Sequence, residues 1–128
     1  MPVYQTLLSM WSRLKKNYKE LMQVTNLHIQ SCLEAWLNCE NLLITVLQKE
    51  TSFSLRTKQV LDECAKICLG TCHALKNGWE NLENVALLCV GICEECAEVC
   101  ERYHDPEFKT CASICRNCSS RIVRLAAA

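Results

Sequence analysis

Residues 89–118 have the sequence CVGICEECAEVCERYHDPEFKTCASICRNC, which holds two runs of cysteines three or four residues apart. The first run has cysteines at 89, 93, 96 and 100, and the second has them at 111, 115 and 118. Residues at these intervals are neighbours on one face of an α-helix. His104-Asp105-Pro106 separates the runs, and Asp105 can cap a helix that has Pro106 at its first position. The stretch therefore predicts two helices, each with a row of thiols.

The same pattern continues toward the N-terminus. Cysteines at 64, 68 and 72 lie in a segment that begins near Ser52 or Ser54, both good helix-capping residues, and ends at Asn77-Gly78. Further upstream, over about residues 25–49, Cys32 and Cys39 lie two turns apart on an apolar stripe. These segments predict two more helices with inward-facing thiols.

The four predicted helices define the fold class. They are of similar length, the third extending from about residue 79 to 103, and short links join them, which makes neighbours antiparallel. With only 3 Gly and 2 Pro in the chain, long uninterrupted helices are favoured over strands and turns. We expect an all-α, antiparallel up-down-up-down four-helix bundle of ferritin-like architecture over residues 25–126. Apolar residues at helical spacing predict an extra N-terminal helical segment over 1–23, within a single domain, 1–128.

Composition narrows the class of protein. The formal net charge is zero, which argues against a nucleic-acid partner. No run of 18 apolar residues exists, so we expect no membrane span, and the N-terminus lacks the pattern of a signal peptide. The chain is therefore expected in the cytoplasm, where its 12 cysteines would be reduced thiols rather than disulfides.

The cysteine stripes coincide with the apolar helix faces, so the thiols should point into the bundle. Two other interpretations stay open, which are inert packing of small apolar side chains and a ladder of disulfides. However, twelve small side chains would make a poor core. Soft thiolates select Cu(I), zinc and iron–sulfur clusters. Cu(I) accepts two or three ligands and so suits helix pairs, which favours several Cu(I) ions per chain, with zinc as the alternative.

A rise of about 1.5 Å per residue gives the approximate heights of the thiols. Lowest are Cys32, Cys68, Cys72 and Cys89, near the middle are Cys39, Cys64, Cys93, Cys115 and Cys118, and near the top are Cys96, Cys100 and Cys111. This distribution predicts a tube of ligands. All twelve cysteines are candidate metal ligands, and His28 and His104, each four residues from a cysteine at a bundle end, are added as candidate entry ligands.

The stretch over 89–118 resembles the cysteine-rich four-helix-bundle copper-binding proteins, which include the bacterial copper storage proteins. Their C-A-x-x-C pattern occurs here at Cys64-Ala65, Cys96-Ala97 and Cys111-Ala112. The resemblance covers about residues 25–126 and implies a homo-oligomer, a tetramer of bundles, that stores Cu(I) without catalysis. The first helix departs from the family pattern because it has only two cysteines, and Gly70 and Thr71 interrupt the second helix. These departures predict a lower copper capacity.

Other functions have weaker support in the sequence. A ferritin-like di-iron enzyme needs two Glu-x-x-His motifs, and only Glu101 to His104 provides one. The C-x-x-C spacings lie within helices rather than after a strand, which disfavours a thiol oxidoreductase. We therefore expect no enzymatic activity. The alternative to copper storage is a zinc-binding or structural helical bundle that acts through protein contacts.

Overall fold

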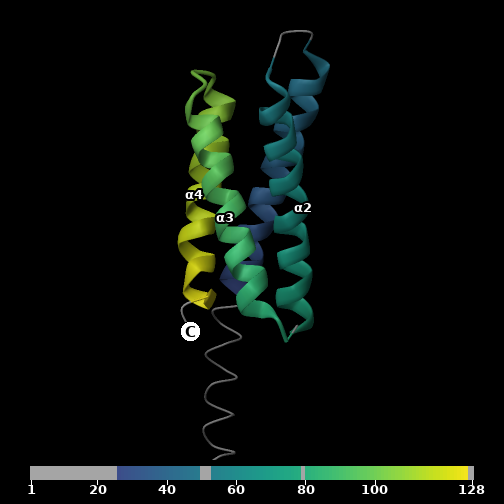
Figure 1. The fold of residues 1–128 in the computed structure, drawn as a ribbon, viewed down its shortest axis with the longest axis vertical. Helices are drawn as coiled ribbons and strands as arrows, with labels where there is room; N and C mark the ends of the chain where they lie inside the picture. The colour runs from purple at the N-terminus through teal and green to yellow at the C-terminus, as the bar shows by residue number, and fades with distance from the viewer. Residues whose placement is uncertain (1–25, 50–52, 79, 127–128) are drawn as a thin grey trace, which may run out of the picture.

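The computed structural model of the chain describes residues 26–49, 53–78 and 80–126. These residues form a first helix over 26–48 and the helices α2 (Leu55–Asn77), α3 (Leu82–Glu101) and α4 (Pro106–Ala126), with no strand among them. The chain runs up the first helix, down α2, up α3 and down α4 (Figure 1). The predicted antiparallel four-helix bundle is confirmed. The predicted helical segment over 1–23 lies outside the described residues.

Local signals in the sequence set most of the helix ends. The backbone N–H of Thr57 donates to the Ser54 hydroxyl over 3.1 Å, so Ser54 is the N-cap of α2. Gly78 ends α2 in the left-handed conformation with φ 63°, which glycine adopts without steric cost. Pro106 is the first residue of α4, and the Asp105 carbonyl accepts from the backbone N–H of Phe108 at 3.1 Å. The predicted N-cap of α2, glycine stop and proline start are confirmed.

Two predictions about helix continuity were wrong. Helix α3 begins at Leu82 and ends at Glu101, which is shorter than the predicted span of about 79 to 103. Helix α2 continues through Gly70 and Thr71 without a break. Thr71 is buried there, and its hydroxyl donates to the Ile67 carbonyl at 2.7 Å, so its polar group is satisfied inside the helix.

The core of the bundle consists mainly of cysteine and small apolar side chains. On the first helix the predicted stripe is buried, with Cys32, Ala35 and Cys39 fully inaccessible to solvent. Larger apolar side chains, such as Leu61 and Ile122, occupy the remaining core positions. None of the described helices is long and apolar enough to cross a lipid bilayer.

An aromatic cluster lies at the end of the bundle that holds the link between α3 and α4, which is the upper end in Figure 1. We call Phe53, Tyr103 and Phe108 the aromatic cap. The rings of Tyr103 and Phe108 stack with centroids 4.4 Å apart, and Phe53 lies 5.4 Å from Phe108. The Tyr103 hydroxyl hydrogen-bonds the Thr57 hydroxyl at 2.7 Å, so its polar tip is satisfied. The cap therefore joins α2, α4 and the link between α3 and α4.

At the lower end of the bundle, hydrogen bonds between polar groups join the helices instead. His28 is only 3 % exposed, and its Nε2 lies 2.8 Å from the Arg121 carbonyl, to which it donates. The Arg121 guanidinium in turn donates to the Ser31 hydroxyl at 2.8 Å. These contacts hold the start of the first helix against the end of α4. The two ends of the bundle are thus chemically different.

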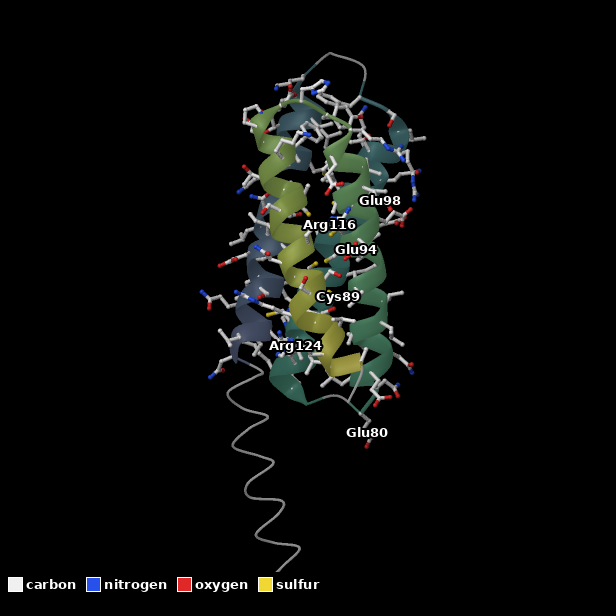
Figure 2. All side chains as sticks on the ribbon, turned by 90° about the vertical axis from the view of Figure 1, so that its left-hand side faces the viewer. Glu80, Cys89, Glu94, Glu98, Arg116 and Arg124 are labelled. Carbon is white, nitrogen blue, oxygen red and sulfur yellow. The ribbon has the colours of Figure 1, made fainter. Side chains whose placement is uncertain are left out.

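An ionic brace joins α3 and α4 on the outside of the bundle. Arg116 pairs with Glu94 and with Glu101, which lies 3.0 Å away, and Ser119 donates to Glu94 at 2.6 Å. Figure 2 shows Arg116 and Glu94 on this outer face, while the yellow sulfur atoms lie inside the bundle. The charged groups therefore stay at the surface, outside the sulfur-lined core.

Candidate metal centre

All twelve cysteines lie within the described residues and are free thiols. Each is buried, with at most 3 % of its surface exposed. Helical spacing accounts for this because every cysteine falls on the inward face of its helix. The sulfur atoms approach one another at 3.6–3.9 Å in the six thiol–thiol contacts between them. The thiols therefore form one column along the bundle rather than isolated core residues.

The centre of the column is a set of four thiols, one from each helix. We call Cys39, Cys64, Cys96 and Cys115 the four-helix ring, whose sulfur atoms all lie within 4.8 Å of one another. The Cys39 sulfur lies 3.9 Å from that of Cys96 and 3.8 Å from that of Cys115. The sulfur of Cys64 lies 3.9 Å from that of Cys115. The antiparallel packing thus brings together thiols up to 76 positions apart in the sequence.

A second set of four thiols lies below the ring and is here called the lower group. It consists of Cys68, Cys89, Cys93 and Cys118, also within 4.8 Å of one another. The sulfur atoms of Cys68 and Cys93 are 3.6 Å apart. Cys32 on the first helix borders this group, with Cys118 and Cys89 as its neighbours. The lower group therefore takes its four members from three helices, with a fifth thiol beside it.

A third set, the upper group, consists of Cys96, Cys100 and Cys111. Its three thiols come from α3 and α4 only. Cys96 belongs both to this group and to the four-helix ring. The shared sulfur makes the upper group and the ring adjoining sites, so an ion in one lies next to an ion in the other.

The heights predicted from the sequence differ from this arrangement at two residues. Cys93 and Cys118 were expected near the middle but lie in the lower group, whereas Cys96, expected near the top, belongs both to the upper group and to the ring. Helix α3 starts at Leu82, about three residues later than predicted, which lowers its cysteines by about 4.5 Å. Cys118 follows Cys115 by one turn and so lies below the ring. The prediction failed because relative heights depend on the residue at which each helix starts, which the sequence indicates only to within a few positions.

Three predicted ligands lie outside these sets. Cys72 is buried at 3 % exposure but belongs to none of the three groups. His28 makes the hydrogen bond to Arg121 at the lower end, and His104 lies exposed in the link between α3 and α4. Neither histidine belongs to a group. Their roles as metal ligands stay predictions.

The thiols change one another's acidity. Neighbouring thiols that donate hydrogen bonds lower the pKa of Cys89, Cys100, Cys115 and Cys118. The pKa of Cys100 is lowered to about 5, mainly by a hydrogen bond from Cys111. The pKa of Cys118 is lowered to about 6, mainly by a hydrogen bond from Cys32. The same contacts raise the pKa of Cys111 and of Cys32. Each group therefore contains at least one thiol that favours the thiolate form, which is the form that binds metal.

The geometry suits soft metal ions. With metal–sulfur bonds near 2.3 Å, three thiolates around one ion lie about 4.0 Å apart, close to the separations in the column. Thiolates select Cu(I) and zinc over harder ions. The sequence pattern found the thiols but not the groups around them. It missed the Thr57–Tyr103 contact of the aromatic cap and the Glu94–Arg116 ion pair, because such contacts between helices leave no local signal.

The fold and the thiol column together define a cysteine-rich, metal-binding helical bundle. The chain matches the family model described as Csp, copper storage protein, over residues 20–127, and it belongs to this family. The resemblance seen in the sequence is thus confirmed.

Two relatives are consistent with this membership. An uncharacterized cysteine-rich protein, YhjQ of Bacillus subtilis (strain 168), is 26% identical over 100 residues, covering 77% of this chain and 93% of the relative. The solved structure of Cu(I)-bound Copper Storage Protein BsCsp3 superposes with a TM-score of 0.77 at 22% identity, covering 80% of this chain and 98% of that one. The structural likeness shows the shared bundle fold.

Proposed function

We propose that this chain stores several Cu(I) ions between the thiolates of its column. The observation that carries the proposal is the continuous contact of the four-helix ring with the upper group through Cys96, and with the lower group through Cys64 and Cys68, whose sulfurs are 3.9 Å apart. One structural ion would need only four thiols, and the three groups together contain ten of the twelve cysteines. Membership of the copper storage family and the Cu(I)-bound state of the similar BsCsp3 structure support this function.

All twelve cysteines are proposed ligands, with His28 and His104 as additional ligands at the two ends. Their membership of the three groups nevertheless predicts that the cysteines contribute unequally to copper binding. Cys96 serves two groups, whereas Cys72 serves none, so loss of the Cys96 sulfur should remove more copper. Both residues are buried cysteines, which makes the same change to serine a matched pair.

The test is an anaerobic titration of reduced, metal-free protein with Cu(I) against a competing chelator. We expect several tightly held ions per chain, a larger loss in Cys96→Ser than in Cys72→Ser, and unchanged helix content in both variants. Binding of fewer than two ions per chain would refute storage. Equal losses in the two variants would refute the role of the groups.

We also propose that the protein acts in the cytoplasm, as a homo-oligomer and without catalysis. The family is one of storage proteins, which supports the absence of catalysis. On the first helix Leu37, Ile44 and Leu47 are at least half exposed, which supports an interface on that face. Light scattering of the purified chain measures its mass in solution, a tetramer being expected from the resemblance. A monomer at all concentrations would refute the oligomer.

A further inference from the structure

The four-helix ring differs from the other two groups in how its ligands are arranged. Each of its thiols comes from a different helix, so the sulfurs approach the centre from four sides. The lower group takes two thiols from α3 and none from the first helix, and the upper group has only three thiols. Among the described residues, the ring is thus the one group whose four ligands come from four different helices.

The dimensions of the ring match a tetrahedral ion. Four sulfurs at about 2.3 Å from one central ion are separated by edges of about 3.8 Å. Three of the six sulfur–sulfur edges of the ring are 3.8–3.9 Å, from Cys39 to Cys96 and Cys115 and from Cys64 to Cys115, and the other three are within 4.8 Å. An ion of this kind therefore fits with little movement of the helices. Tetrahedral coordination by four thiolates is typical of zinc and not needed for Cu(I).

The surroundings of the ring help to hold the charge. Four thiolates around a divalent ion leave a net charge of −2, which is costly in a buried site without hydrogen-bond donors. Cys111 lies 3.8 Å from the Cys39 sulfur, and Cys68 lies 3.9 Å from the Cys64 sulfur. Neither is a ring member, so both can stay protonated and donate to the ring thiolates. The ring therefore has four ligands and thiol donors beside them.

We propose that, in the absence of copper, the four-helix ring binds one divalent, tetrahedral ion of the zinc class. The ion would tie all four helices together at their centre. Cu(I), which thiolates prefer, would displace it when copper is available. The four ring thiols are also ligands in the proposed copper store, and in copper-free protein they would bind this divalent ion instead. It does not require copper binding, because its test is carried out without copper.

The test is an anaerobic titration of reduced, metal-free protein with Co(II), whose tetrahedral tetrathiolate complexes absorb visible light strongly. We expect one Co(II) per chain with this absorption and its loss on adding Zn(II). Cys64→Ser and Cys115→Ser, made separately on different helices, should each abolish the tetrathiolate spectrum. Cys100→Ser, in the upper group, and Cys89→Ser, in the lower group, are the matched controls and should retain the first equivalent.

Several outcomes would overturn the inference. The first is absence of the tetrathiolate spectrum in the unmodified chain, and the second is its survival in both ring variants. The third is its loss in Cys89→Ser with survival in Cys64→Ser, which would place the ion in the lower group. Circular dichroism of each variant shows whether the bundle has formed. A thermal midpoint that Zn(II) raises in the unmodified chain but not in Cys64→Ser gives a second readout. The Cu(I) titration is separate, so either proposal can fail alone.

Discussion

The aromatic cap should carry a large part of the stability of the metal-free bundle. Phe108 is only 2 % exposed and stacks on Tyr103 at 4.4 Å and on Phe53 at 5.4 Å. Truncation of a buried phenylalanine to alanine costs about 3–5 kcal/mol, because it removes apolar contacts and leaves a cavity. A domain of this size has roughly 5–15 kcal/mol of stability in total. Phe108→Ala should therefore bring the metal-free protein close to unfolding.

The effect can be measured by thermal unfolding of reduced, metal-free protein followed by circular dichroism. For a chain of 128 residues each kcal/mol lowers the midpoint by roughly 3–5 °C, so a loss of about 3 kcal/mol or more should lower it by at least about 9 °C. Val123→Ala on the same helix is the control, because Val123 is 43 % exposed and its truncation should cost less than about 0.5 kcal/mol. A loss below about 1 kcal/mol for Phe108→Ala would refute the described packing.

Metal binding should not depend on the aromatic cap, so it can be measured separately from the effect of the cap on stability. None of the three thiol groups includes a residue of the cap, so Phe108→Ala should keep its number of Cu(I) ions per chain. Ions that bind only the folded state also stabilise it by mass action, by about 2.7 kcal/mol at a hundredfold excess over Kd. Copper should therefore restore much of the lost thermal stability. A variant that binds fewer ions while folded would show that the cap supports the metal centre directly.

Three further predictions concern the cap of α2, the ionic brace and the response to pH. Ser54→Ala removes the hydroxyl that accepts from Thr57, and it should cost about 1 kcal/mol in urea unfolding, against no change in Ser113→Ala at an exposed mid-helix site. Arg116→Met removes an exposed ion-pair network, so its cost should stay below about 1 kcal/mol and shrink in high salt, and a larger, salt-independent loss would contradict this assignment. The pKa of Cys100 is lowered to about 5 from 9.0, so its thiolate stabilises the folded state fully above about pH 9, and this contribution is lost as pH falls toward 5. The thermal midpoint of metal-free protein should accordingly fall over that window, and less steeply in Cys100→Ser; identical slopes would refute the shift.

The features that the sequence predicted well are those that depend on neighbouring residues along one helix. The inward stripe of the first helix follows from apolar residues at intervals of three and four, and the start of α2 follows from the hydroxyl of Ser54. The stop at Gly78 follows from its conformational freedom. These effects are local, so they are visible without knowledge of the packing.

The features that the sequence did not predict depend on how the helices are placed against each other. Membership of the four-helix ring depends on relative heights, which shift when α3 starts at Leu82 rather than near residue 79. The sequence suggested that His28 could face incoming metal, and the structure gives its Nε2 a backbone carbonyl of α4 at 2.8 Å. A carbonyl carries no sequence signature, so such a partner is found only in three dimensions.

The complete burial of the thiols has a consequence for the time that an ion stays bound. With every cysteine at most 3 % exposed, an ion in the column has no direct contact with the solvent. It can leave only when helices part or fray, so its residence time follows the rate of local opening. Changes far from any sulfur, at a cap or an outer ion pair, can then shorten retention without weakening a single metal–sulfur bond. The lifetime of the cargo is in this sense a property of the helix packing.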